Sequence, residues 1–458
     1  MSGAPRLVAS DDGLLRHGPA RVVWQLGLPL ALGLASHALI NLVDLLLIGR
    51  LGEAAVRAAH VATTWNFVPM IVGNCVTTAL LARLSRALAA DRPAARQFHR
   101  RAEWCLLWFG ALVSLLSAAP ASAMVAWTGI EGAAADDAVH YLVVSNLGCL
   151  PMFALMQTTA AMRAAGEARM PLLLLLLANV LNLGLDLVLL FGWPALGLPG
   201  IGVVGAAYAS VAARTVAAVL AFAWLARARH PLSLRAVPAA VPPLPVLRPL
   251  LADAWPQVLQ IGLRAGVVLA LTAVVQRRFG DAAVAALGIT TRLDTLILFA
   301  ALGFANAATA YSGRAVVVGW PDAARAAGLW AAAAAGGFGA LLLAGLWWGC
   351  ERMVGWFLPD ATGDVVDVAV AYVGSVGWSQ VLGAVALGAI GAVHGAGRMV
   401  LPLVVDVVGF GFVYGPLWWC AASDADLATV FASLVAGMAV VAVLHVTVVA
   451  FGRWPRPR

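Results

Sequence analysis

Residues 29–52 read PLALGLASHALINLVDLLLIGRLG, an almost unbroken apolar run that contains a single acid, Asp44, and ends beside an arginine. About 20 such residues are enough for a helix to cross the hydrocarbon core of a membrane. Comparable runs recur along the 458 residues, of which 62% are hydrophobic and 11% are charged. A soluble domain carries roughly 25% charged residues. The composition therefore predicts an all-α membrane protein and excludes a soluble one.

The apolar runs predict twelve transmembrane helices, because charged or Gly/Pro-rich breaks separate them. We expect these helices at 22–48, 58–82, 104–128, 138–162, 171–192, 201–226, 251–276, 283–312, 326–349, 366–393, 401–421 and 427–451. The longest polar link follows the sixth helix. We therefore divide the chain into a cytoplasmic N-terminal segment (1–21), an N-lobe (22–226), a cytoplasmic linker (227–250), a C-lobe (251–451) and a cytoplasmic tail (452–458).

The arginines outside these helices give the orientation. With the N-terminus inside, 21 of them lie in cytoplasmic segments and 5 lie in external loops. Loops rich in arginine stay on the cytoplasmic side of a membrane. The pattern predicts a multi-pass protein of the bacterial inner membrane with both termini in the cytoplasm. It also assigns the net charge of +7 to contacts with membrane lipids rather than with nucleic acid.

The two halves of the chain repeat each other. RLGEAAV at 50–56 matches RFGDAAV at 278–284, and a glycine stands five residues before a proline in both halves, at Gly166 and at Gly397. Each half has six spans, so it starts and ends on the same side of the membrane, and the repeat is parallel. This predicts two pseudo-symmetric six-helix lobes around a central cleft, an arrangement that is typical of alternating-access transporters.

Several stretches resemble the MATE (multidrug and toxic compound extrusion) family of the MOP flippase superfamily. Besides residues 29–52, they are MRAAGEARMP (162–171), ANVLNLGLDLVLLFG (178–192), GIGVVGAAYAS (200–210), RFGDAAVAALGITTRLD (278–294) and GAGRMVLP (395–402). The similarity extends over essentially the whole chain and is nearest to the DinF-like and archaeal-type branch. It implies an antiporter of two six-helix lobes that exports substrates in exchange for H⁺ or Na⁺.

In that branch the coupling carboxylates lie on the first and fifth helices, and the pattern carries over onto Asp44, Asn182 and Asp186. A carboxylate inside a span costs about 2.5–3.5 kcal/mol on insertion scales, so it is rarely accidental. Asn182 is one turn from Asp186, and Asn41 stands in the same relation to Asp44. Two acids and an amide can hold Na⁺; alternatively, two like charges in a dry pocket favour the binding of a proton.

Other residues are assigned from their positions. Pro29 lies inside the first helix and removes a backbone hydrogen bond, so we predict a hinge there. We predict a substrate cleft with adaptable apolar and polar contacts, lined by Trp65, Met70, Met156, Gln157 and Arg264. For Arg264, and equally for Arg214, a salt bridge to an acid of the same lobe is the alternative. The second half carries Asp294 and Asp406 but has no acidic pair that matches Asp44 and Asp186.

The most favoured function is an ion-coupled antiporter that exports drug-like or metabolite small molecules. A flippase for a lipid-linked or amphiphilic substrate of the same superfamily is the first alternative. A polytopic membrane enzyme is the second, but it would need a catalytic acid in a long external loop, and these loops are short. No catalytic or nucleotide-binding motif is present. We therefore expect a monomeric transporter that is not an enzyme, that has no cofactor, and that is driven by H⁺ or Na⁺.

Overall fold

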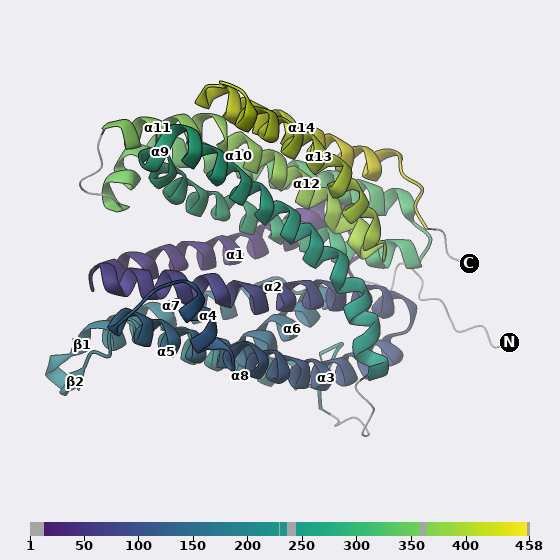
Figure 1. Ribbon diagram of the computed structural model, residues 1–458. Coiled ribbons are helices and arrows are strands. Elements are labelled where there is room, and N and C mark those ends of the chain that lie inside the picture. Colours follow the sequence, from purple (N-terminus) through teal and green to yellow (C-terminus); the bar gives the residue numbers. More distant parts are fainter. Residues whose placement is uncertain (1–12, 229, 236–243, 358–362, 456–458) are drawn as a thin grey trace. The chain divides into compact units, whose positions relative to one another are not determined.

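The computed structural model describes residues 13–228, 230–235, 244–357 and 363–455, so parts of the predicted N-terminal segment, linker and tail lie outside the described residues. Helices dominate these ranges (Figure 1). They are α1 (Pro19–Gly49), α2 (Glu53–Ala90), α3 (Arg92–Ala118), α4 (Ala121–Trp127), α5 (Ala133–Leu147), α6 (Cys149–Ala165), α7 (Arg169–Phe191), α8 (Val204–Leu225), α9 (Leu244–Val317), α10 (Pro321–Phe357), α11 (Gly363–Ser375), α12 (Gly377–Gly395), α13 (Val400–Ala422) and α14 (Leu427–Phe451). Between α7 and α8, β1 (Gly192–Trp193) pairs antiparallel with β2 (Leu198–Pro199) around the short turn η2 (Pro194–Leu196).

Twelve stretches of the described residues are long and apolar enough to cross a membrane, which confirms the predicted number of spans. Two of them consist of two helices each. The fourth span, Ala133–Ala165, contains α5 and α6, and the tenth, Val366–Gly395, contains most of α11 with α12. Conversely, α9 contains two spans, because Gly280 interrupts it with φ 77° and ψ −168°.

The third span does not lie where the sequence predicted it. The prediction was 104–128, but α3 runs from Arg92 to Ala118, and 121–127 form the separate short helix α4. Asp91 caps α3 by accepting a hydrogen bond from the Ala94 amide at 3.2 Å, and Pro93 occupies the first turn, where proline is tolerated. These start signals lie among arginines that we had interpreted as a loop.

Equivalent interruptions in the two halves support the internal repeat. Gly52 (φ 102°) ends the link after the first span, and Gly280 (φ 77°) breaks the chain after the seventh, 228 positions later. These left-handed φ values favour glycine, since other side chains would clash. The fourth span is broken at Gly148, and the tenth is broken at Val376, again 228 positions later.

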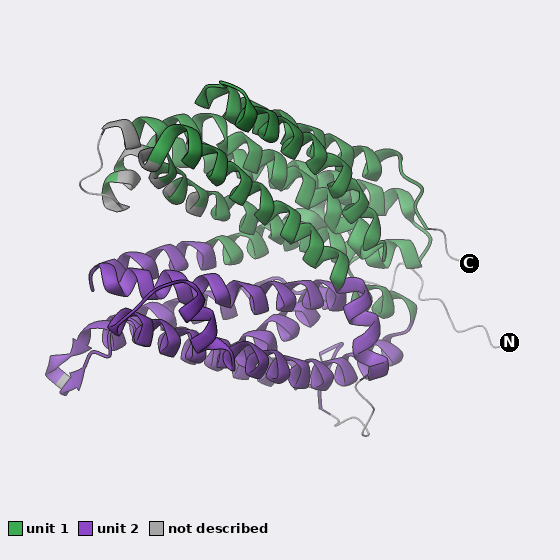
Figure 2. Cartoon of the chain, in the orientation of Figure 1, with its two compact units in different colours: residues 1–35, 85–90, 255–458 green, residues 36–84, 91–254 purple. Residues whose placement is uncertain are grey.

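The chain divides into two compact units (Figure 2). Unit 1 comprises 1–35, 85–90 and 255–458, and unit 2 comprises 36–84 and 91–254. The predicted lobe boundaries stay a prediction, and the units differ from them at the ends of α1, α2 and α9. In unit 1, α1 approaches α9 closely, because a side chain at Gly303 would lie 2.2 Å from the backbone nitrogen of Ala31.

The first turns of α9 belong to unit 2, where an arginine of α2 holds them. Arg83 forms an ion pair with Asp253, with Nε and Oδ2 2.7 Å apart, and it donates a second hydrogen bond to the Pro249 carbonyl at 3.1 Å. The α9 helix therefore begins in one unit and continues in the other, as α1 does. The helices that carry the first and seventh spans thus both change unit along their length.

Small residues build the helix contacts inside each unit. In unit 2, alanines of α2, α5 and α8 form one buried cluster with Leu142 and Tyr141. In unit 1, a side chain at Gly388 of α12 would meet the Ala331 carbonyl of α10 at 2.4 Å, so the two backbones touch. Helices in membranes associate through such small residues, because lipid tails are as apolar as leucine.

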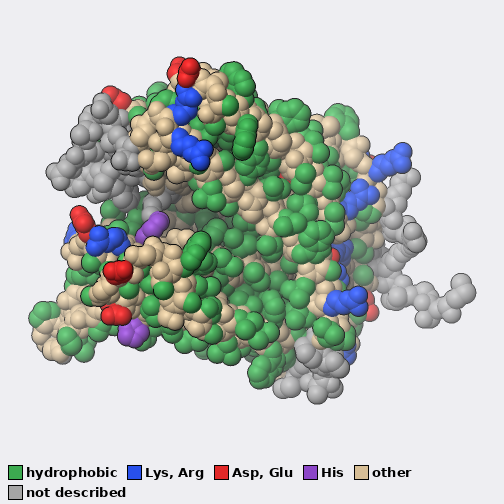
Figure 3. Space-filling view, viewed as in Figure 1, with side chains coloured by type: hydrophobic (Ala, Val, Ile, Leu, Met, Phe, Trp, Pro, Cys, Tyr) green, Lys and Arg blue, Asp and Glu red, His purple; other side chains and the backbone are tan. Residues whose placement is uncertain are grey.

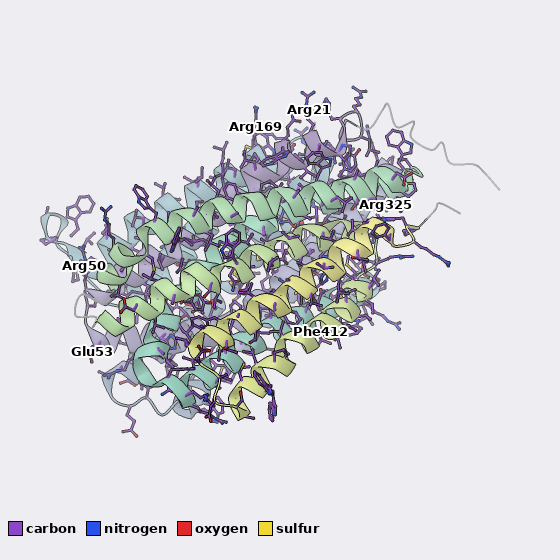
Figure 4. All side chains as sticks on the ribbon, turned by 90° about the horizontal axis from the view of Figure 1, so that it is seen from above. Arg21, Arg50, Glu53, Arg169, Arg325 and Phe412 are labelled. Carbon is purple, nitrogen blue, oxygen red and sulfur yellow. The ribbon has the colours of Figure 1, made fainter. Side chains whose placement is uncertain are left out.

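Charged side chains lie mainly at the ends of the helices. On the face in view, apolar side chains cover most of both units (Figure 3). In unit 2, Arg50 and Glu53 lie at one end of the helices, and Arg169 lies toward the other (Figure 4). This agrees with the predicted alternation of loops within that unit, while the orientation in the membrane stays a prediction.

Candidate functional site

The candidate site of unit 2 is formed by polar residues on facing sides of α1 and α7. On α1, His37 and Asp44 are seven residues apart, and on α7, Asn179 and Asp186 have the same separation. Residues seven apart share one face of a helix. One row of polar side chains therefore lies along α1 and another along α7. The two rows meet at two levels along the helices, once at Asp44 and Asp186 and once at His37 and Asn179.

At the first level, the carboxyl groups of Asp44 and Asp186 are neighbours. Asp186 is fully buried, with 0% of its surface exposed. Its Oδ2 accepts a hydrogen bond from Asn182 Nδ2 at 2.5 Å. Oδ1 of Asp44 and Oδ1 of Asp186 are both buried and accept no hydrogen bond from the described part of the chain. The structure thus brings together three of the four predicted coupling residues.

Ser210 of α8 contacts the amide of Asn182 on the side away from Asp186. Its hydroxyl donates to Asn182 Oδ1 at 3.2 Å, which leaves the amide nitrogen to donate to Asp186. The carboxyl pair therefore faces the N–H side of Asn182 rather than its oxygen. The choice between an oxygen cage for Na⁺ and a shared proton, which the sequence left open, stays a prediction.

At the second level, Asn179 connects α7 to α1. Its amide donates to Ser36 Oγ at 3.1 Å, and its Oδ1 lies 3.3 Å from His37 Nδ1. Sequence reasoning did not identify His37 as part of the site. The spacing of seven residues to Asp44 was the signal that could have found it.

Two further groups surround the carboxyl pair. Tyr141 of α5 is buried, and the charges of Asp44 and Asp186 act on its hydroxyl. The guanidinium of Arg214 on α8 acts on Asp44 and on Tyr141. Among the described residues, Arg214 forms no ion pair. The salt bridge that the sequence left open for Arg214 is therefore not formed there, and its positive charge acts on Asp44 from a greater distance. Asn41 is exposed and is not brought to the pair.

The predicted cleft residues of unit 2 separate into two groups. Met70 and Met156 are partly buried and pack against the same cluster around Phe153. Trp65 lies in a different cluster, with its ring centroid 5.9 Å from that of Trp127. Gln157 is fully buried. It donates to the Glu103 carbonyl at 3.3 Å, which makes it an interhelical bridge between α6 and α3.

In unit 1, Arg264 of α9 points to an acid of its own unit. Its Nη2 lies 4.0 Å from Oδ1 of Asp406 on α13, and 19% of its side chain is exposed. This is the alternative that the sequence left open for Arg264. Asp294, the other acid of this unit, accepts a hydrogen bond from the Tyr372 hydroxyl at 2.6 Å.

Pro29 lies inside the continuous helix α1. The residues beside it pack tightly within unit 1, since a side chain at Gly27 would lie 2.5 Å from the Phe304 ring. From Ser36 onward α1 belongs to unit 2. The proline is therefore close to the point where α1 passes from one unit to the other, and its hinge function stays a prediction.

Outside the spans, Glu167 joins the α6–α7 loop to the chain after α8. Its Oε1 lies 3.3 Å from His230 Nε2, and its Oε2 accepts a hydrogen bond from Trp224 Nε1 at 3.0 Å. Burial raises the pKa of Glu167, but the hydrogen bond and charge of His230, helped by Trp224 and Arg227, outweigh burial. The pKa of Glu167 therefore lies below the usual glutamate value.

Comparison with known proteins identifies relatives over nearly the full length. The family model described as MatE matches residues 29–188 and 256–419, one match in each half of the chain. The multidrug resistance protein NorM of Burkholderia vietnamiensis is 27% identical over 466 residues, which cover 97% of this chain and 96% of NorM. A probable NorM of Deinococcus radiodurans is 27% identical over 68% of this chain and 67% of its own length.

Solved structures share the fold at low sequence identity. A multidrug resistance MATE family transporter of the MOP superfamily, solved in an outward-facing conformation, gives a TM-score of 0.84 at 20% identity, over 97% of both chains. A MOP superfamily transporter from Pyrococcus furiosus gives a TM-score of 0.83 at 20% identity, over 94% of this chain and 95% of its own. At this identity the likeness concerns the fold.

Proposed function

Because the chain belongs to the MatE family of membrane transporters, which are not enzymes, we propose that it is a proton-coupled exporter of drug-like or metabolite small molecules. It works by alternating access in the bacterial inner membrane. One observation carries the proposal: Asp44 of α1 and Asp186 of α7 are neighbours, and each has a buried carboxyl oxygen without a hydrogen-bond partner among the described residues.

The carboxyl pair holds one exchangeable proton. An ionised carboxylate can only accept hydrogen bonds, so a bond between two carboxyl groups requires that one of them carries a proton. When this proton leaves, α1 and α7 carry like charges at close range, which repel each other more strongly in a buried site than in water. Proton binding and release thus change how α1 and α7 pack, and α1 leads from unit 2 into unit 1.

The geometry supports H⁺ over Na⁺ as the coupling ion. A sodium ion needs several oxygen ligands, but Asn182 presents its N–H group to Asp186 and its oxygen to Ser210. The unpartnered acceptors at the site are single carboxylate oxygens of Asp44 and Asp186. Two such oxygens are sufficient for a shared proton, whereas binding of Na⁺ requires the amide to turn over.

The substrate class is proposed from the relatives and from the apolar side chains of unit 2. The NorM relatives are named as multidrug resistance proteins. Met70 and Met156 pack around Phe153 and remain partly buried. Methionine side chains are flexible and polarisable, so they adapt to apolar ligands of different shapes. Export of several unrelated amphiphilic compounds is the expected behaviour.

Transport by the purified protein in proteoliposomes tests this proposal. Fluorescent cationic drugs, a neutral metabolite and a fluorescent lipid are supplied under an imposed pH gradient or an imposed Na⁺ gradient. We expect drug transport with the pH gradient alone, and its loss in Asp44→Asn. Asp137→Asn, which removes an exposed carboxylate of the same unit, is the matched control. Transport driven only by Na⁺, or movement of the lipid alone, contradicts the proposal.

We also propose that both termini are cytoplasmic. All five native cysteines are buried, so an engineered surface cysteine can be labelled against a low background. A cysteine at Gly197, in the link between β1 and β2, should react with an impermeant reagent added outside cells. A cysteine at Arg235 should react only after the membrane is opened. Labelling of position 235 from outside contradicts this topology.

A further inference from the structure

Unit 1 contains a buried polar cluster that the proposed coupling site does not use. Asp406 of α13 is fully buried, and its Oδ2 accepts a hydrogen bond from Gln260 Nε2 at 2.8 Å. Its Oδ1 faces two nitrogen-bearing side chains, His445 of α14 at 3.4 Å and Arg264 of α9 at 4.0 Å. His445 is 3% exposed. Helices α9 and α14 of unit 1 thus bring Arg264 and His445 to the same carboxylate oxygen of Asp406 on α13.

Both ring nitrogens of His445 face acceptors. Nδ1 lies 2.9 Å from the Val441 carbonyl oxygen, one turn back on α14. On the other side, Nε2 lies 3.4 Å from Asp406 Oδ1, and the Pro402 carbonyl also acts on the ring. A neutral imidazole has a single N–H group and can satisfy only one of these sides. A second proton, between Nε2 and Asp406 Oδ1, is needed to satisfy both.

Other charges oppose this second proton. Arg264 already supplies a positive charge to the same carboxylate oxygen, and this charge also acts on the imidazole of His445. Burial also disfavours a charged imidazole. The carboxylate of Asp406 and the two carbonyl groups favour the proton, while Arg264 and burial disfavour it. A proton held between opposing interactions of this kind can be exchanged during a transport cycle.

We propose that Asp406 and His445 form a second proton-binding site, in unit 1, which takes up one proton between His445 Nε2 and Asp406 Oδ1. Uptake converts a neutral imidazole into an imidazolium–carboxylate pair, and release leaves the Nε2 lone pair facing Asp406. Gln260 and Arg264 hold the carboxylate in place. The role in transport rests on the proposed proton coupling, whereas the binding of the proton itself does not.

Nitrogen-15 NMR of histidine-labelled protein in detergent tests the proton binding without any transport. We expect one histidine with both nitrogens protonated near neutral pH, and its signals should disappear in His445→Gln. In Asp406→Asn the same histidine should become the neutral tautomer with the proton on Nδ1. The exposed His140, replaced in His140→Gln, provides the matched control for assignment. A neutral His445 in the wild type, or an unchanged signal in Asp406→Asn, overturns the proposal.

The number of protons exchanged per substrate tests the role in transport. With the membrane potential held at zero, each coupled proton supports about a tenfold substrate gradient per pH unit. We expect about a hundredfold gradient in the wild type and about a tenfold one in His445→Gln and in Asp406→Asn. If one of the two variants does not fold into a monodisperse protein, the other variant alone is sufficient for this test. If a folded variant reaches the same substrate gradient as the wild type, Asp406 and His445 have no role in transport. If the substrate gradient of the wild type does not depend on the pH gradient, the proposed function is wrong, even where NMR shows the proton on His445.

Discussion

Replacement of Asp186 by asparagine should stop transport while the protein stays folded. Asparagine keeps an oxygen that can accept the hydrogen bond from Asn182 Nδ2. It also keeps the size of the side chain in a fully buried position. Asparagine carries no charge, so the pair with Asp44 can no longer alternate between one shared proton and two like charges. We expect the melting temperature in detergent to stay within a few degrees of the wild type.

The size of the effect follows from the repulsion that the variant lacks. Two unit charges at ~4 Å in a medium of effective dielectric constant ~20 repel by about 4 kcal/mol. Loss of this energy changes the equilibrium between two packings of α1 and α7 by roughly a thousandfold, since each 1.4 kcal/mol is a factor of ten. The initial rate of transport driven by a pH gradient should therefore fall at least a hundredfold, to the level of empty liposomes.

Asp406→Asn is the comparison that makes this prediction specific to one unit. It removes a carboxylate that is equally buried, but that lies beside Arg264 and His445 instead of another acid. We expect this variant to keep a measurable rate, with a smaller final gradient. A rate of Asp186→Asn within about threefold of the wild type, or a larger loss of rate in Asp406→Asn, refutes the assignment of the main coupling site to Asp44 and Asp186.

Three further predictions address the frame around the sites. Pro29→Ala restores a backbone hydrogen bond in α1, so it should raise the melting temperature and slow transport; a faster transporter contradicts the hinge. Gly388→Val places a side chain against the Ala331 carbonyl at 2.4 Å and should destabilise the protein by about 1–3 kcal/mol, measured by thermal unfolding. Gly345→Ala, where the added atom meets nothing within 4 Å, is its control and should be neutral. Since the pKa of Glu167 is lowered in the folded protein, its contribution is present above the usual glutamate pKa and is lost as the pH falls below it. Glu167→Gln should therefore lower the melting temperature at pH 7, and the difference from the wild type should shrink as the pH falls through the lowered pKa of Glu167; a constant difference contradicts the role of the charge.

Most of the fold could be predicted because crossing a membrane requires a signal that is local in the sequence. Apolar runs of sufficient length gave the correct number of spans, and the equivalent glycines at 52 and 280 mark the repeat. The third span was misplaced because its start is amphipathic. The cap at Asp91 and the proline at 93 start α3 among arginines, so hydropathy alone treats its first turns as a loop.

The candidate sites could be predicted only in part, for a similar reason. Spacing along one helix indicates that Asn182 and Asp186 share a face, and a lone acid such as Asp44 stands out in an apolar run. Contacts between helices leave no such pattern. The pairing of Asp406 with His445, and the contact of His37 with Asn179, depend on which faces of distant helices meet. Sequence periodicity does not contain that information.

Proton release on substrate binding is the most direct test of the carboxyl pair. A transported drug is added to purified protein in weakly buffered detergent solution, and a pH indicator counts the protons released per bound drug. Drug binding is measured separately in the same samples. We expect the wild type to release protons when it binds the drug, and Asp186→Asn to bind the drug but release one proton fewer. Equal release by both proteins would show that Asp44 and Asp186 do not hold the exchanged proton.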